Sequence, residues 1–155
     1  MKIVILAISK TDENFINDGV KEFIKRINLF CQVDFEIINE PKNHSKLPIL
    51  EQIQVESKLI EKFVQQSDIV VLLDEKGKSY SSVEFSKQME LWLNSNKKRL
   101  VFVIGGPFGI SELLKNKYFT LSLSNMTFNH QLIRLLLLEQ IYRAFTIIKG
   151  LPYHK

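Results

Sequence analysis

The last residues of the chain include side chains that can hold or move a proton. Tyr153, His154 and Lys155 end the chain, and Arg143 lies earlier, in the final predicted helix, four residues after Glu139. A histidine titrates near neutral pH, so it can act as a general base or bind a substrate in a fixed orientation. By themselves, however, these residues have ordinary interpretations. Chain ends often fray, and Glu139 and Arg143 have the spacing of an ion pair on a helix surface.

A second candidate is a loop rich in glycine. Three of the six glycines in the chain, Gly105, Gly106 and Gly109, lie within five positions directly after the apolar run RLVFVI. The loop matches neither the GxGxxG of dinucleotide-binding folds nor the GxxxxGK[ST] of phosphate-binding loops, because Gly105 and Gly106 are adjacent and Ser111 follows an isoleucine. Glycine here either permits a tight turn or lets the backbone approach a ligand, and composition alone leaves both alternatives open.

A third segment, LSLSNMTF at residues 121–128, ends a predicted strand in small polar residues. It continues directly into the last predicted helix, so it is also a connection at the end of a strand. Two such loops side by side indicate a pocket. This segment therefore shifts the interpretation of the glycine loop towards ligand binding.

The elements that must position these loops alternate along the chain. Apolar or alternating runs predict strands, and apolar residues at helical spacing predict helices between them. The expected strands cover residues 2–9, 31–38, 68–74, 99–106 and 118–125, and the expected helices cover about 15–27, 50–64, 82–92, 111–116 and 129–149. Ser81 and Glu84 have the spacing of a capping box for the third helix, and Gly150 is placed to end the last one.

This order predicts an α/β fold of one domain, residues 1–155, with a mostly parallel sheet of five to six strands flanked by helices. In such sheets ligands bind at the carboxyl ends of the strands. Those ends are Leu73 with Asp74, Gly105 with its loop, and Ser124 with the residues after it. The sequence thus predicts where a site lies before it predicts what the site binds.

Composition restricts the class of protein. Hydrophobic residues make up 45% and charged residues 25%, as in ordinary globular proteins. The single cysteine, Cys31, cannot form an internal disulfide. The apolar segments at residues 1–10 and 132–148 are too short or too interrupted by charge to span a membrane. We therefore expect a cytoplasmic protein without a membrane anchor. The net charge of +4 is compatible with a nucleic-acid partner but does not require one.

Taken together, these segments resemble one known family. FVIGGPFGIS at residues 102–111, combined with SNMTFNHQ, EQIYRA and the terminal YHK, is similar to the bacterial 23S rRNA pseudouridine-N3 methyltransferases of the SPOUT class. KIVILAISK near the start and VVLLDEKGK at residues 70–78 extend the resemblance over nearly the whole chain. It implies a deep trefoil knot at the C-terminal end of the fold, which is rare among proteins, and a homodimer.

The resemblance also implies S-adenosyl-L-methionine as methyl donor, bound in the knot, and no metal. Carried over to this chain, the residues that bind the donor are Leu73, Gly105, Leu123, Ser124, Asn125, Met126, Thr127 and Phe128. His154, Tyr153 and Arg143 become the candidate catalytic residues, with His154 as general base or as an anchor for the substrate base. One position departs from the family's pattern: Phe108 stands in the glycine loop where relatives often carry a polar residue.

The substrate that the resemblance implies is N3 of a pseudouridine in 23S rRNA, methylated in the large subunit or on the assembled ribosome, with no membrane partner. Two alternatives of other kinds stay open. One is a ribosome-associated protein that keeps the knot without catalysis, and the other is a nucleotide-binding enzyme with a flavodoxin-like or Rossmann-like fold. The missing glycine fingerprints disfavour the second alternative.

Three further features of the chain can be interpreted in more than one way. His130 and Arg134, near the start of the last predicted helix, are open between substrate contacts and structural hydrogen bonds. His44, in a polar loop, shows no partner. Residues 132–138 are apolar on nearly every side, which predicts burial all round and a contact with a partner subunit.

Overall fold

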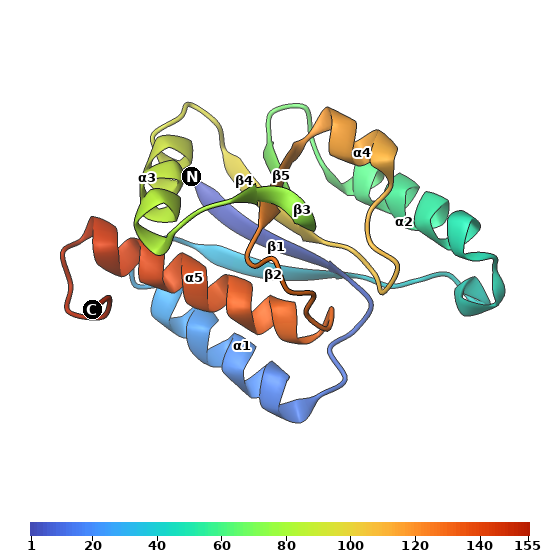
Figure 1. Ribbon diagram of the computed structural model, residues 1–155, viewed down its shortest axis with the longest axis horizontal. Coiled ribbons are helices and arrows are strands. Elements are labelled where there is room, and N and C mark those ends of the chain that lie inside the picture. The colour runs from blue at the N-terminus through green and yellow to red at the C-terminus, as the bar shows by residue number, and fades with distance from the viewer.

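The computed structural model describes residues 1–155 and alternates strands with helices, as the sequence predicts. Its strands are β1 (Lys2–Ile8), β2 (Val33–Ile38), β3 (Ile69–Ser79), β4 (Arg99–Ile104) and β5 (Phe119–Ser122). Its helices are α1 (Asn14–Ile27), α2 (Ile49–Phe63), α3 (Ser82–Leu93), α4 (Glu112–Lys117) and α5 (Leu132–Ile148), with a short 3₁₀ turn at His44–Lys46. The strands form one parallel sheet in the order β2-β1-β4-β3-β5, which confirms an α/β fold with five strands (Figure 1).

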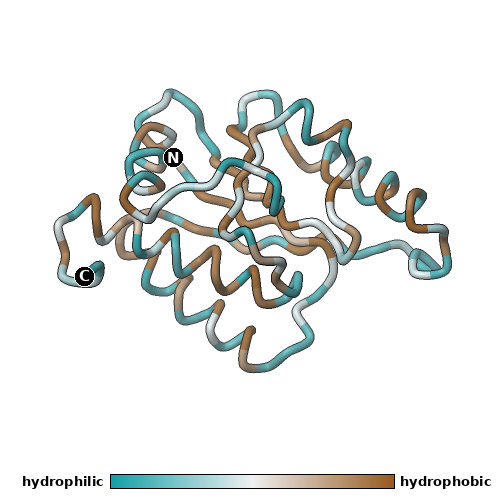
Figure 2. The backbone as a smooth tube through the Cα atoms, in the orientation of Figure 1, coloured by the Kyte–Doolittle hydropathy of each residue, from teal (hydrophilic) through white to brown (hydrophobic).

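Helices cover both faces of this sheet. α1, α3 and α5 pack on one face, and α2 and α4 pack on the other (Figure 1). The residues of β1 alternate between the two layers: Ile3 and Ile5 join the core beneath α1, α3 and α5, whereas Val4 and Leu6 join the core beneath α2 and α4. A strand buried on both faces needs apolar side chains at every position, which explains the unbroken apolar run. Apolar residues gather along the central strands, and the helices alternate between apolar and polar residues (Figure 2).

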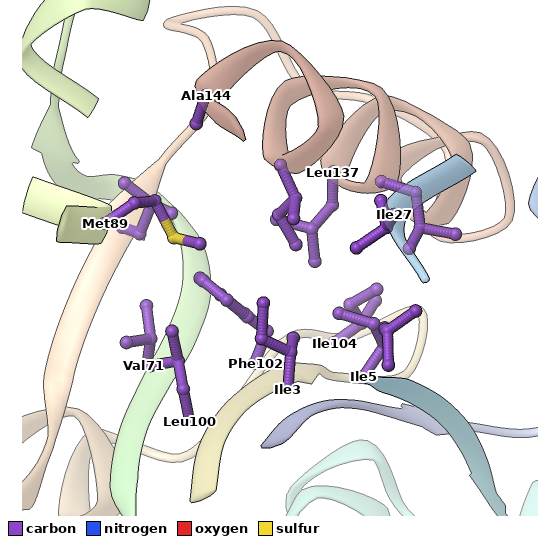
Figure 3. Close-up of a cluster of buried hydrophobic side chains, with 14 of the residues drawn as sticks. Ile3, Ile5, Ile27, Val71, Met89, Leu100, Phe102, Ile104, Leu137 and Ala144 are labelled. Carbon is purple, nitrogen blue, oxygen red and sulfur yellow. The ribbon is translucent and has the colours of Figure 1, made fainter. Parts of the chain in front are cut away.

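The larger core lies between the sheet and α1, α3 and α5 (Figure 3). Phe102 of β4 belongs to it together with Met89 of α3 and Leu137 of α5. Trp92 packs edge-on against Phe102 and Phe119, with ring centroids 6.0 and 5.7 Å away, so it is a core residue. Full burial of a leucine, phenylalanine or methionine side chain stabilises a fold by about 1.5–3 kcal/mol. The contacts of Phe102, Met89 and Leu137 therefore hold α3 and α5 on the sheet.

Two predicted helix ends are confirmed. The Ser81 hydroxyl accepts the Glu84 N–H, and the Glu84 carboxylate accepts the Ser81 N–H, which completes the capping box of α3. At the end of α5, Gly150 has φ of +63° and follows the last turn of the helix. Its left-handed backbone lets the Leu151 N–H donate to the Thr146 carbonyl at 2.8 Å, which ends the helix.

β3 is longer than predicted, and its extra residues meet β5 a second time. Leu121 of β5 pairs with Leu73 and again with Lys78, with a register shift between them. Here β3 passes so close to β5 that a Cβ on Gly77 would lie 2.7 Å from the Leu121 nitrogen and 2.7 Å from the Thr120 carbonyl carbon. Only a residue without a side chain permits this approach of two backbones.

The connection after β5 also differs from the prediction. β5 ends at Ser122 and α5 begins at Leu132, whereas the sequence predicts a longer strand and an earlier helix start. The Ser122 hydroxyl donates to the Ser124 carbonyl at 2.9 Å, and the Met126 N–H donates to Ser124 Oγ at 2.9 Å. These local bonds compete with the bonds of the sheet, so the small polar side chains end the strand early.

α5 is not buried on all sides in the single chain. Leu137 and Leu138 are fully buried, but Leu135 and Leu136 are only half-buried. The prediction of burial all round is therefore wrong for one chain alone, and part of an apolar helix surface stays accessible. Neither α5 nor any other helix has the length and apolar character needed to cross a membrane.

Gly77→Ala tests the close approach of β3 and β5. The added methyl group forces the two backbones apart, so we expect the free energy of unfolding to fall by about 3 kcal/mol, at the upper end of the usual range for overpacking. Urea denaturation measures the change. Lys78→Ala, one residue further on, removes an exposed side chain and should cost within about 0.5 kcal/mol. Equally small losses in both variants would contradict the close approach.

Candidate functional site

A cavity of about 530 Å³ opens at the carboxyl ends of β4 and β5, beside the bend in the middle of β3. Its walls are residues 73–76 within β3, residues 104–109 at the end of β4 and beyond, and members of the segment 121–130 at the end of β5 and beyond, completed by Lys115 of α4 and Ile133 of α5. A volume of this size is typical of small-molecule sites. The sequence predicts a site at this edge of the sheet, because parallel strands all end there.

The glycine loop is both a tight turn and a wall of this cavity. Gly109 has φ of +83°, a conformation that residues with side chains rarely adopt, and its N–H donates to the Gly106 carbonyl at 3.1 Å. Gly105 packs so tightly on its own loop that a Cβ there would lie 2.7 Å from Ile110 Cγ1. The two alternatives that the sequence leaves open are therefore compatible: the turn is what brings a bare backbone to the cavity.

Gly106 lacks a side chain for a different reason. The carboxylate of Glu56, from α2, lies beneath the loop and accepts the Gly106 N–H, with 3.3 Å between Oε2 and the nitrogen. A Cβ on Gly106 would lie 2.6 Å from Glu56 Oε1. Burial raises the pKa of Glu56, although the bond from Gly106 and the nearby His44 act in the opposite direction. Sequence reasoning missed Glu56.

The residues that the resemblance assigns to the cofactor largely meet at the cavity. Those that line it are Leu73, Gly105, Leu123, Ser124, Met126, Thr127 and Phe128. Asn125 lies in the same loop but does not line the cavity. The Thr127 hydroxyl donates to the Glu75 carboxylate, so the loop after β5 is tied to the bend in the middle of β3.

The mouth of the cavity is apolar and accessible. Met126 is 74% exposed, Phe108 47% and Phe128 37%, although all three are large hydrophobic residues. Exposed apolar groups gathered round a cavity indicate a surface that a ligand or a partner covers. Phe108, which departs from the family's pattern, makes the outer wall of the glycine loop apolar in this chain.

An ion pair that sequence reasoning missed lies in the cavity wall. Lys115 Nζ is 2.6 Å from Asp74 Oδ2, and both side chains are largely buried. Burial is the largest single influence and acts to raise the pKa of Asp74 and to lower that of Lys115. The ion pair, together with the Lys76 N–H on Asp74 and the Glu112 carboxylate on Lys115, outweighs it, so the pKa of Asp74 is lowered and that of Lys115 is raised. Glu112 also contacts this ammonium, at 3.1 Å, but is exposed. The wall thus carries fixed charges of both signs.

The three candidate catalytic residues lie together, but they do not line this cavity. Arg143 Nη2 lies 2.6 Å from Glu139 Oε1, as the helix spacing predicts. The Tyr153 hydroxyl donates to the same oxygen at 3.0 Å, and Arg143 Nη1 lies 3.5 Å from His154 Nδ1. α5 has 17 residues and spans about 25 Å. Ile133, near its start, lines the cavity, whereas the cluster lies in its second half and in the chain end that follows it (Figure 1).

Hydrogen-bonding rules assign the proton of the His154 ring. Arginine has no acceptor, so in its contact with His154 the Arg143 guanidinium donates and Nδ1 accepts. A neutral imidazole then carries its proton on Nε2. Burial and the bond to the Glu139 carboxylate raise the pKa of Tyr153, so its hydroxyl stays protonated at neutral pH. The Arg143 guanidinium also covers the Tyr153 ring, 4.8 Å from its centroid, so the tail packs on α5.

The two residues left open near the start of α5 have different roles. Arg134 is fully buried, and its guanidinium donates to the Ile8 carbonyl and Thr11 Oγ1 at 2.7 Å each and to the His130 carbonyl at 3.1 Å. It therefore ties α5 to the end of β1 and is structural. His130 lines the cavity, where burial and the charge of Arg134 lower its pKa. Its ring is thus neutral at pH 7 and can donate or accept a hydrogen bond.

Comparison with known proteins gives matches over the full length. The family described as "Predicted SPOUT methyltransferase" matches residues 1–154. The chain is 44% identical over 155 residues to the Ribosomal RNA large subunit methyltransferase H of Flavobacterium psychrophilum and 44% identical to that of Parabacteroides distasonis, with 99% of each chain covered in both comparisons.

Among solved structures, the chain is similar to a probable methylase family protein from Haemophilus influenzae. The TM-score is 0.52 with 11% sequence identity, and the match covers 96% of this chain and 66% of that one. At this identity the similarity shows the fold alone. It agrees with the layered parallel sheet seen here.

Asp74→Asn tests the ion pair in the cavity wall. Because Lys115 holds the Asp74 pKa below its ordinary value, the ionised pair stabilises the fold at neutral pH, and this contribution is lost as the pH falls through the lowered pKa, below about 4. We expect the variant to be less stable than the wild type by about 1.5 kcal/mol at neutral pH and to lose less on acidification. Denaturation at a series of pH values measures both.

Glu112→Gln is the control for this variant. It removes the second, exposed carboxylate near the same ammonium, so it should change stability by less than about 0.5 kcal/mol. An acid dependence that is the same in the wild type and in Asp74→Asn would contradict the role of the pair.

Proposed function

Because the chain belongs to the family of predicted SPOUT methyltransferases, we propose that it transfers a methyl group from S-adenosyl-L-methionine to large-subunit ribosomal RNA. The observation that carries the proposal is that the loops shared with the family's sequences are also the loops that wall the cavity. Relatives named Ribosomal RNA large subunit methyltransferase H match over 99% of both chains, and the loops with the family's motifs are the ones that wall the cavity. We further propose that the target is N3 of a pseudouridine in 23S rRNA, on the large subunit or the assembled ribosome in the cytoplasm.

The cavity suits this methyl donor. The Gly106 N–H and C=O already bond Glu56 and Gly109, so it is the bare backbone of Gly105 that can approach an adenosine with its polar groups. Met126, Phe108 and other apolar residues can enclose the ring. Fixed charges of both signs in the wall match an amino-acid group that carries an ammonium and a carboxylate. When bound, the donor supplies a methyl group on a sulfonium, and the residues round it contribute positioning and the exclusion of water.

We also propose that the chain forms a deep trefoil knot at this site. The support is the double pairing of Leu121 with Leu73 and Lys78, which is expected where β5 passes through the bend that β3 makes between these two residues. The backbone contact at Gly77 has the closeness that such a passage requires. In a knot, the loops that wall the cavity are held by the covalent chain as well as by side-chain contacts.

A homodimer explains why the candidate catalytic residues lie away from the cavity. No residue after Ile133 lines the cavity of its own chain, and the tail packs at the far end of α5. Leu136 of α5 is half-buried and joins neither core, so it offers apolar surface that a second chain can cover. We propose that the tail of one chain completes the cavity of the other.

The chemistry also fits the polar groups of the tail. N3 of a pseudouridine carries a proton that must pass to solvent water or to a base before the nitrogen takes up the methyl group, so a group that stabilises the developing anion assists the transfer. With Nδ1 facing Arg143, the His154 ring presents an Nε2–H that can donate to a carbonyl oxygen of the base. This geometry favours His154 as the anchor that stabilises the substrate anion over His154 as the general base. Arg143 adds positive charge beside it and orients the ring.

Met126→Ala tests whether the cavity binds the donor. The side chain is 74% exposed, so its loss should leave stability unchanged within about 0.5 kcal/mol, whereas loss of its contact with a ligand should weaken S-adenosyl-L-methionine binding about tenfold. Calorimetry measures the affinity. Leu113→Ala removes a similar side chain, 68% exposed, that does not line the cavity, and should bind as the wild type does. Binding of NAD with none of the methyl donor would refute the proposal.

Mixed dimers test whether the sites are shared. One chain carries Gly105→Ala, which forces the glycine loop to shift, and the other lacks residues 151–155. If each tail serves its partner's cavity, one site in the mixed dimer joins an intact cavity to an intact tail, and methyl transfer to ribosomal RNA recovers. If each tail serves its own cavity, both sites are damaged, and the mixed dimer stays as inactive as the two parent dimers.

A further inference from the structure

A buried group of charged side chains lies beneath the glycine loop. His44, in the 3₁₀ turn, and Glu56, in α2, are each 3% exposed. The sequence shows no partner for His44, and this interpretation is wrong. Its Nε2 lies 3.3 Å from the Gln52 carbonyl oxygen and 3.5 Å from Glu56 Oε1, and its Nδ1 lies 3.5 Å from Glu40 Oε1. Burying charged groups costs free energy of folding unless they are paired, so a buried histidine with two carboxylates suggests a function beyond stability.

The His44 ring connects two carboxylates. A carbonyl oxygen only accepts, so the Nε2 that faces Gln52 carries a proton, which it also directs towards Glu56. The other ring nitrogen faces Glu40. The two carboxylates thus face different nitrogens, whereas a metal ion binds only one nitrogen of a ring. The geometry therefore suits a clamp, in which the His44 ring bonds Gln52 and lies against the Glu56 carboxylate, better than a metal centre.

Glu56 extends this clamp to the cavity. Its carboxylate accepts the Gly106 N–H at 3.3 Å, and the missing side chain of Gly106 is what admits it. Gly105 and Gly106 both line the cavity. The peptide between them is trans, so with its N–H on Glu56 its carbonyl, that of Gly105, points the opposite way. The Glu56 carboxylate thus fixes the direction of the peptide between Gly105 and Gly106. It thereby fixes which polar groups of the loop face a ligand.

α2 also contacts the residues that follow the glycine loop, at the two ends of α4, but these contacts lie away from the cavity. The Ser57 hydroxyl lies 2.8 Å from the hydroxyl of Ser111, the N-cap of α4, and Glu61 pairs with Lys117 at 3.1 Å. None of these four residues lines the cavity. Glu56 is therefore the residue through which α2 bonds the backbone of the cavity wall.

We propose that Glu56, held by His44, is a positioning residue for the methyl donor, because its carboxylate fixes the Gly106 peptide that forms one wall of the donor's site. The proposal rests on the proposed function, since it takes the ligand of the glycine loop to be S-adenosyl-L-methionine. Binding should then be strongest with Glu56 ionised, since a charged carboxylate is the stronger acceptor, and should weaken as the carboxyl takes up a proton.

The surroundings of Glu56 define the sign of its effect on stability. The groups that face it are the Gly106 N–H, the His44 ring and, further away, Glu40. Burial is the largest influence and raises its pKa, so the folded state holds this proton more tightly than the unfolded chain does. Stability is therefore lost as the pH rises through that pKa. A neutral acceptor at position 56 should make the fold at least as stable at neutral pH.

Three variants separate positioning from a structural role. Glu56→Gln keeps an acceptor oxygen without the charge, and Glu56→Ala removes both. Glu61→Gln is the control, since it alters an acidic residue of the same helix that bonds α4 and not the glycine loop. Calorimetry measures the affinity for S-adenosyl-L-methionine at a series of pH values from acidic up to about pH 8, and Tm is measured in parallel.

We expect Glu56→Ala to bind about tenfold more weakly than the wild type at the upper end of this range. Glu56→Gln should bind with a smaller loss, should not share the wild type's weakening at low pH, and should have a Tm at or above that of the wild type. Glu61→Gln should match the wild type in affinity and in its pH dependence.

The NMR shift of the Gly106 amide reports the contact without any ligand. It should move with pH in the wild type and stay constant in Glu56→Gln. If the wild type binds no S-adenosyl-L-methionine, the proposed function fails, while this amide still tests the contact. If the donor binds normally and Glu56→Gln keeps the wild-type pH dependence, or if its only change is a lower Tm, the positioning role is overturned.

Discussion

The pairing of β5 with β3 is the contact on which the candidate site depends. β3 lies between β4 and β5, so the bend within β3 and the loops after β4 and β5 meet at one place. Gly77 permits the pairing to extend along the second half of β3, because only a bare backbone can lie this close to β5. With β5 elsewhere in the sheet, Leu123 and Met126 would not face Gly105, and the cavity would lack one of its walls.

The elements of the fold could be predicted because their signals are local, as the apolar run of β1 and the capping box of α3 show. The edge of the sheet that holds the cavity followed from strand direction, and the resemblance supplied residues such as Leu73 and Gly105. Contacts between segments distant in the chain, such as that of Lys115 with Asp74, gave no local signal. Glu56 did leave one: it lies three residues after Ile53 and four before Ile60, on the buried side of α2, where a carboxylate needs a buried partner.

Two buried charges flank the cavity, and both contact backbone. Arg134 donates to the carbonyls of Ile8 and His130, and Glu56 accepts the N–H of Gly106. Removing such groups from water costs free energy that their bonds do not fully return. What they provide is a fixed direction for peptide groups at the ends of strands, which is what a site that works by positioning requires.

The most direct test of the assignment as a ribosomal RNA methyltransferase is mass spectrometry of rRNA nucleosides. Large subunits or ribosomes from a strain that lacks the enzyme are incubated with the protein and S-adenosyl-L-methionine carrying a labelled methyl group. We predict one labelled nucleoside, a pseudouridine methylated at N3, in 23S rRNA, and a severe loss of label with His154→Ala. No label in any ribosomal RNA, from a protein that is folded and binds the donor, would contradict the assignment.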